Sequence, residues 1–173
     1  MPLNPNASEL IMRKGNRKIF IETGTAEGDG IECALKAGFE EIYSIELNPN
    51  LFEKCKKKFK DEKNVHLICG SSEKELPKLL ENINDPFVLW LDAHYSGGDY
   101  ITEVMFVYLP KEIDSIKKYS EKFNDSVIMI DDMNYFMKDK NFCTKIEKLI
   151  NEVKTTGSIQ YIDSYSATHL VKM

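Results

Sequence analysis

The chain has 173 residues, with 23 basic and 28 acidic side chains and a formal net charge of −5. Only two of the basic residues are arginines, Arg13 and Arg17. This balance excludes a dedicated binder of nucleic-acid phosphates, which normally carries a basic face. No apolar run approaches the roughly 18 residues of a membrane span, so we expect no membrane partner either.

The length fits one domain, residues 1–173, in which residues 1–17 form a segment ahead of the first predicted strand. The first residues are polar and lack the basic and apolar regions of a signal peptide. The four cysteines are scattered, without a CxxC pair or a matching histidine spacing, at positions 33, 55, 69 and 143. We therefore expect reduced thiols in a cytoplasmic protein, and neither a zinc site nor a disulfide framework.

Short β-rich runs alternate with amphipathic segments, which predicts repeated β–α units over a parallel sheet. Strands are expected at 18–22, 41–46, 64–69, 86–92 and 126–131. Helices are expected at about 29–38, 49–60, 73–83, 103–120 and 140–153. Two final strands, 158–163 and 167–172, are separated by only three residues and must pair antiparallel. The predicted fold class is α/β: a Rossmann-like, mostly parallel seven-stranded sheet with helices on both faces and an antiparallel C-terminal hairpin.

The first predicted strand ends in an acid and then a glycine-rich turn that opens a helix. Glycines at 24, 28 and 30 give the spacing GxxxGxG, whereas the dinucleotide fingerprint GxGxxG would need glycines in place of Ala26 and Asp29. This spacing disfavours an NAD-dependent oxidoreductase. The acid and the turn resemble the first motif of class I S-adenosylmethionine (SAM) methyltransferases. The resemblance implies a strand order of 3-2-1-4-5-7-6 and cofactor contacts from Glu22, Thr23, Gly24, Thr25 and Gly28.

A second acid, Glu46, ends the second predicted strand 22 residues after Gly24. Such a carboxylate can accept hydrogen bonds from both ribose hydroxyls of a nucleoside, because each oxygen takes one donor. The alternative is an ordinary exposed glutamate. After the third strand, the resembling family commonly uses an acidic or small polar residue to contact the adenine amino group, and this chain has serine where aspartate is frequent. The implied contacts here are Glu46, Leu47, Gly70, Ser71 and Ser72, with Asp92 from the fourth strand.

Three aspartates lie at or just after the ends of the fourth and fifth predicted strands, which should be neighbours. Asp92, Asp131 and Asp132 would then converge, and three close carboxylates favour a cation between them. A hard divalent ion, Mg²⁺ above all, suits such oxygen ligands. The alternative is that Asp92 caps a turn and one of the pair caps the next helix. The pattern resembles the metal-dependent sugar O-methyltransferases of the macrocin and novobiocin type, although those enzymes carry longer lid elements.

A hydroxyl nucleophile must lose its proton for methyl transfer, and His94 in a glycine-flanked loop is the candidate base, with Asp92 as the other candidate. The sequence thus predicts a SAM-dependent, metal-assisted O-methyltransferase whose partner is a small-molecule acceptor, a sugar or another vicinal diol. Two alternatives stay open: a metal-independent N- or O-methyltransferase, and a non-catalytic SAM-binding subunit. The oligomeric state is also open, a homodimer included.

Overall fold

A computed structural model describes residues 13–93, 101–122, 124–131, 138–153, 158–161 and 170–172. Its strands are β1 (Ile19–Thr23), β2 (Glu41–Glu46), β3 (Val65–Cys69), β4 (Phe87–Leu91), β5 (Val127–Ile130), β6 (Ser158–Tyr161) and β7 (Leu170–Lys172). Its helices are α2 (Asp29–Ala37), α3 (Pro49–Lys58), α4 (Ser72–Asn82), α5 (Ile101–Tyr119) and α7 (Lys140–Glu152), with a 3₁₀ turn η1 (Ser120–Lys122). Within the described residues, each predicted helix and strand is confirmed to within a few residues.

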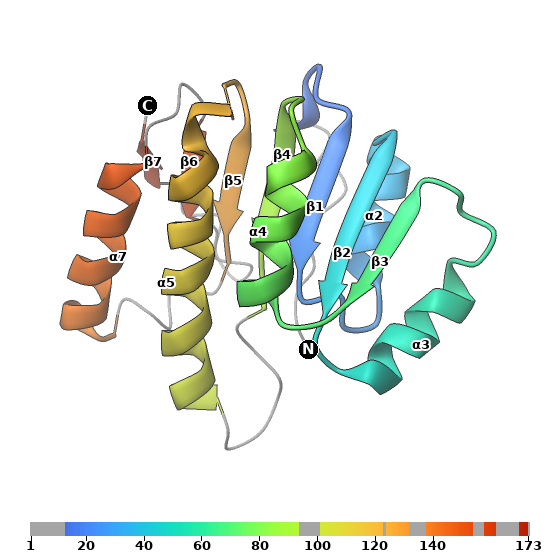
Figure 1. The fold of residues 1–173 in the computed structure, drawn as a ribbon, viewed down its shortest axis with the longest axis horizontal. Helices are drawn as coiled ribbons and strands as arrows, with labels where there is room; N and C mark the ends of the chain where they lie inside the picture. Colours follow the sequence, from blue (N-terminus) through green and yellow to red (C-terminus); the bar gives the residue numbers. More distant parts are fainter. Residues whose placement is uncertain are drawn as a thin grey trace.

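The sheet has the order β3-β2-β1-β4-β5-β6-β7. Strands β1 to β6 pair in parallel, and only β7 runs antiparallel, against β6. The carboxyl ends of the parallel strands therefore share one edge, which lies at the bottom of Figure 1. Polar residues that follow these strands are consequently brought together along this edge.

The end of the sheet differs from the predicted order 7-6, which is wrong. The chain leaves β5 through α7, and its next strand, β6, pairs in parallel with β5 itself. Consecutive strands joined by a helical crossover usually lie side by side. With β6 beside β5, the last strand, β7, pairs with the free outer edge of β6. The expected tight turn at 164–166 lies outside the described residues.

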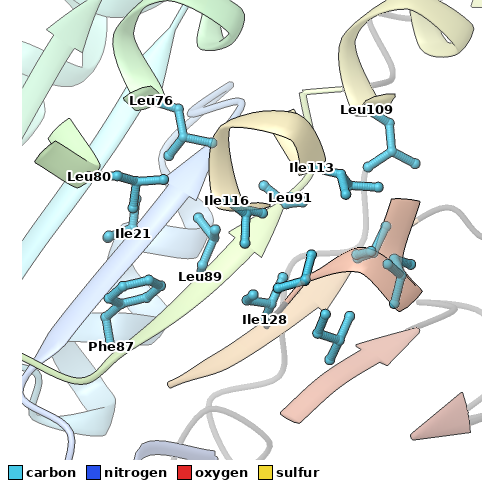
Figure 2. Close-up of a cluster of buried hydrophobic side chains, with 14 of the residues drawn as sticks. Ile21, Leu76, Leu80, Phe87, Leu89, Leu91, Leu109, Ile113, Ile116 and Ile128 are labelled. Atoms are coloured by element: carbon cyan, nitrogen blue, oxygen red, sulfur yellow. The ribbon is translucent and has the colours of Figure 1, made fainter. Parts of the chain in front are cut away.

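Helices cover both faces of the sheet (Figure 1). On one face α4, α5 and α7 pack on a large apolar cluster; on the other, α2 and α3 pack on a second cluster. Figure 2 shows how leucine and isoleucine side chains of α4 and α5 meet those of β1, β4 and β5, among them Leu80, Ile116 and Leu89. Strand β4 is buried along its whole length because both of its faces are covered, as expected for a central parallel strand.

Capping residues fix where α3 begins and where α2 ends. Helix α3 begins where the Asn48 side chain accepts a hydrogen bond from the Asn50 backbone and Pro49 occupies the first turn. Helix α2 ends at Gly38, whose φ of 77° is the left-handed conformation that favours glycine. In the described part of the chain, we find no helix with the length and apolar character of a membrane span.

Candidate functional site

The turn after β1 needs glycine at two positions. Gly24 has a φ of 88°, and a Cβ atom there would lie 2.6 Å from the carbonyl oxygen of Asp92. Gly28 has a φ of 82°, and its Cβ would lie 2.5 Å from the Phe59 ring. Both the backbone conformation and the close approach exclude a side chain, because Cβ contacts under 3.0 Å essentially never occur. The predicted motif therefore marks a tightly packed loop between β2, β4 and α3.

The third glycine of the motif makes room for the acid that precedes it. A Cβ atom on Gly30 would lie 2.0 Å from Glu22 Oε2, so the carboxylate rests directly on the first turn of α2. Glu22 is only 3% exposed. Burial raises the pKa of this carboxyl to about 8; the Ser44 hydrogen bond opposes the shift, and the charges of Glu46 and Asp29 add to it. The buried surroundings of Glu22 therefore favour its protonated form at neutral pH.

A residue that the sequence analysis did not assign, Ser44, links Glu22 to the loop. Glu22 and Ser44 are direct neighbours across β1 and β2. The Ser44 Oγ atom lies 2.6 Å from Glu22 Oε1 and 2.5 Å from Thr25 Oγ1. Ser44 and Thr25 are both buried. The only sequence signal for this contact is that Ser44 lies two residues before Glu46, on the same face of a strand.

Glu46 uses both carboxylate oxygens to hold backbone at the end of β2. Its Oε2 atom accepts from the Ala26 backbone N–H at 2.9 Å, and its Oε1 atom accepts from the Asn48 backbone N–H at 2.8 Å. Each oxygen keeps a further lone pair, so the carboxylate can still accept ribose hydroxyls. Beside it, Leu47 is 57% exposed, which is unusual for a large apolar side chain.

The start of α4 lies next along the sheet edge. The Gly70 backbone N–H donates to the Glu46 carbonyl at 2.8 Å, which ties the end of β3 to the end of β2. The hydroxyl oxygens of Ser71 and Ser72 are buried and have no hydrogen-bond partner among the described residues. Because buried hydroxyls are normally paired, these two oxygens indicate a place where a polar ligand can bind.

The backbone also brings two of the three predicted metal ligands, Asp92 and Asp131, to one edge of the sheet. The Asp92 N–H donates to the Thr23 carbonyl at 3.1 Å, and the Asp131 N–H donates to the Leu91 carbonyl at 3.1 Å. These two aspartates thus continue the paired strands β4 and β5. Asp131 is 2% exposed and Asp92 is half-buried. The other two predicted residues, Asp132 and His94, lie outside the described residues, and the part that is described contains no group of three metal-ligating side chains.

Helix α3 holds the outer side of the same loop, through residues that the sequence analysis did not assign to the site. Lys54 forms an ion pair with Glu27, and Lys58 Nζ donates to the Glu27 carbonyl at 2.9 Å. The Cys55 thiol lies 3.3 Å from the Ala26 carbonyl oxygen, and burial raises the pKa of this thiol to about 11. At neutral pH the thiol is protonated and available as a weak donor, so Cys55 is a packing residue of the loop.

No family model matches the chain, and no curated protein does. Among solved structures, the chain is similar to cofactor-bound Rv0187 from MTB, with 12% identity and a TM-score of 0.63 over 95% of this chain and 77% of that one. It is similar to a putative caffeoyl-CoA O-methyltransferase from Staphylococcus aureus, with 19% identity and a TM-score of 0.52 over 84% and 68%. It is also similar to the yeast reductase Gre2 complexed with NADPH, with 12% identity and a TM-score of 0.57 over 84% and 57%.

At these identities the likenesses show the fold alone, and they include both a methyltransferase and a nicotinamide-dependent reductase. The chain spans about half the length of several solved structures that it matches, such as 49% of Pen from Bacillus thuringiensis. The α/β fold with a mostly parallel sheet is thereby established. The choice of cofactor must come from the residues at the sheet edge.

Proposed function

We propose that the protein is a SAM-dependent methyltransferase with its cofactor site at the carboxyl ends of β1, β2 and β3. The observation that carries the proposal is the group around Glu46. A buried carboxylate, an exposed Leu47 and two unpartnered serine hydroxyls follow one another along the sheet edge. This set offers an acceptor for ribose hydroxyls, an apolar surface for a purine ring and polar atoms for its edge.

The glycine loop fits the same cofactor better than it fits a dinucleotide. Gly24 and Gly28 are positions that a Cβ atom could not occupy, and they belong to the spacing GxxxGxG. The dinucleotide fingerprint places its glycines at other positions. An acid at the end of the second strand binds a ribose in NAD-binding proteins too, so Glu46 does not distinguish the two cofactors. The loop spacing is therefore the feature that separates the two cofactors here.

Bound SAM would supply a methyl group that is already activated for transfer. The chain's own part is then to orient the two reactants and to remove a proton from the acceptor. Asp92 adjoins Gly24, so the end of β4 lies beside the loop that would hold the cofactor. In this proposal His94, two residues further on, takes the acceptor's proton, and Asp92 is the alternative base.

The proposal extends to a divalent ion, with Mg²⁺ held by Asp92, Asp131 and Asp132. Two of these aspartates follow adjacent paired strands, and oxygen ligands of this kind suit a hard cation. Such an ion lowers the pKa of a coordinated hydroxyl, which favours O-methylation of a sugar or another vicinal diol. Activity that survives complete chelation would select the metal-independent alternative.

Calorimetry of the purified chain with S-adenosylhomocysteine (SAH) and with NADPH tests the cofactor assignment. We expect SAH to bind and NADPH to bind much more weakly or not at all. Glu46→Ala should weaken SAH binding by about 1.5 to 3 kcal/mol, because charge-assisted hydrogen bonds are lost. Glu40→Ala is the matched control, since Glu40 is an exposed glutamate paired with Lys18 at the opposite end of β2. Preferential binding of NADPH would refute the proposal.

A further inference from the structure

Three buried side chains from three segments form one hydrogen-bonded chain beneath the glycine loop. Glu22 belongs to β1, Ser44 to β2 and Thr25 to the loop itself. The two contacts, Glu22 Oε1 to Ser44 Oγ and Ser44 Oγ to Thr25 Oγ1, measure 2.6 and 2.5 Å. All three residues are at most 3% exposed, so water does not compete for these bonds. Ser44 is the central member, because both of the described hydrogen bonds that link Glu22 to Thr25 are made by its hydroxyl.

The direction of these hydrogen bonds depends on a single proton, because the serine hydroxyl has only one hydrogen to donate. When Glu22 is ionised, Ser44 donates to Glu22 Oε1, and Thr25 donates to Ser44. When Glu22 carries a proton on Oε1, it donates to Ser44, and Ser44 donates to Thr25. The Thr25 hydroxyl then keeps its own hydrogen for another acceptor at the loop.

The surroundings of Glu22 favour the protonated form at neutral pH. Burial raises the pKa of Glu22 to about 8. The titratable groups that act on this region are Glu46 on β2, Asp29 and Cys33 on α2, and Cys55 on α3. The two carboxylates oppose a negative charge on Glu22, and the two thiols are neutral at this pH because burial raises the pKa of each.

Strand β2 holds consecutive loop residues from the same face. Ser44 contacts Thr25, and Glu46 accepts from the backbone of Ala26. The Thr25 carbonyl in turn accepts from the Gly28 backbone N–H at 2.8 Å, which closes the turn. A displacement of Thr25 would therefore move the whole turn, including the backbone that faces the proposed cofactor.

We propose that Ser44 is a positioning residue for the cofactor loop, which couples Glu22 to Thr25 and holds the turn in the conformation that binds SAM. This inference rests on the proposed function. It assigns to Ser44 a role in cofactor affinity although the residue is buried behind the loop and need not touch the cofactor.

The test compares the dissociation constant of SAH for the wild type and for matched variants. Ser44→Ala should raise it by about fivefold to thirtyfold, as expected for the loss of one or two buried hydrogen bonds. Ser126→Ala is the control, because Ser126 is also a buried serine, and its hydroxyl oxygen accepts a hydrogen bond from the Phe87 backbone N–H at the far end of the sheet. This control should leave the dissociation constant within about twofold.

A second pair of variants covers the case in which Ser44→Ala does not fold. Thr25→Val keeps the shape of the side chain, removes the hydroxyl and should lose about the same factor in SAH affinity as Ser44→Ala. Thr25→Ser keeps the hydroxyl and should bind SAH more tightly than Thr25→Val does. The pH profile is a readout that a purely structural role would not move. Wild-type affinity should change between pH 6 and 9, and Glu22→Gln and Ser44→Ala should each remove most of that change.

The outcomes separate the two proposals. If the wild type binds SAH, and both Ser44→Ala and Thr25→Val bind it equally tightly, this inference is refuted and the proposed function stands. A flat wild-type pH profile also refutes the coupling to Glu22. If the wild type does not bind SAH at all, the proposed function fails, and the role of Ser44 in cofactor affinity fails with it.

Discussion

The buried Glu22 should make the stability of the protein depend on pH in a way that one substitution removes. In Glu22→Gln, an amide of nearly the same shape replaces the carboxyl, can still bond to Ser44 and cannot ionise. The folded-state pKa of Glu22 is raised from 4.5 to about 8. The folded protein therefore binds more protons than the unfolded chain between these values, and its stability falls as pH rises from about 4.5 to about 8.

The size of the effect follows from the same two values. The interval between 4.5 and about 8, at about 1.36 kcal/mol per pH unit, corresponds to an upper figure of about 5 kcal/mol. Glu22 has already begun to titrate in the unfolded chain at pH 5, and local opening of the loop would relieve part of the cost. We therefore expect the wild type to lose about 2 to 4 kcal/mol relative to Glu22→Gln between pH 5 and pH 9. This is a large fraction of the stability of an ordinary domain.

Urea unfolding at several pH values, followed by the fluorescence of Trp90, measures the effect directly. Trp90 is the single tryptophan of the chain and is buried in β4, directly across from Glu22 in β1. The matched control is Glu40→Gln, because this exposed glutamate lies far from the buried network. Parallel pH profiles for the wild type and Glu22→Gln would show that Glu22 is ionised at neutral pH, and would refute the reasoning.

Three further substitutions test the loop, the core and the chemistry. Gly24→Ala should abolish SAH binding in calorimetry and lower the unfolding free energy by about 1 to 3 kcal/mol or more, because φ is 88° and the Asp92 carbonyl lies 2.6 Å from the added atom; unchanged binding would contradict the loop geometry. Leu80→Ala should cost about 2 to 5 kcal/mol in urea unfolding, because Leu80 is fully buried between α4 and the sheet, and a loss under about 1 kcal/mol would argue against that packing. His94→Gln should lower kcat by about 10² to 10⁴ with SAH affinity unchanged. Wild-type turnover of this variant would exclude His94 as the general base and assign that role to Asp92.

The order and the extents of the helices and strands could be predicted from local features of the sequence. Hydrophobic periodicity and capping residues act over a few positions, so the start of α3 at Pro49 and the end of α2 before Gly38 could be predicted without any tertiary contact. The glycine spacing after β1 was equally legible, because the tight turn needs Gly24 and Gly28 whatever lies beyond it.

Tertiary structure decided the order of the last strands and the roles of individual polar residues. The sequence predicted a C-terminal pair of strands but not that β6 would lie beside β5. The orders β5-β6-β7 and β5-β7-β6 both satisfy the same local sequence pattern. A cofactor contact of Glu22 stays a prediction, and the described contacts of its side chain are Ser44, 22 positions away, and the first turn of α2. Glu22 becomes buried and meets Ser44 only once the sheet has formed. Neither the raised pKa of Glu22 nor its contact with Ser44 could therefore be predicted from residues that are neighbours along the chain.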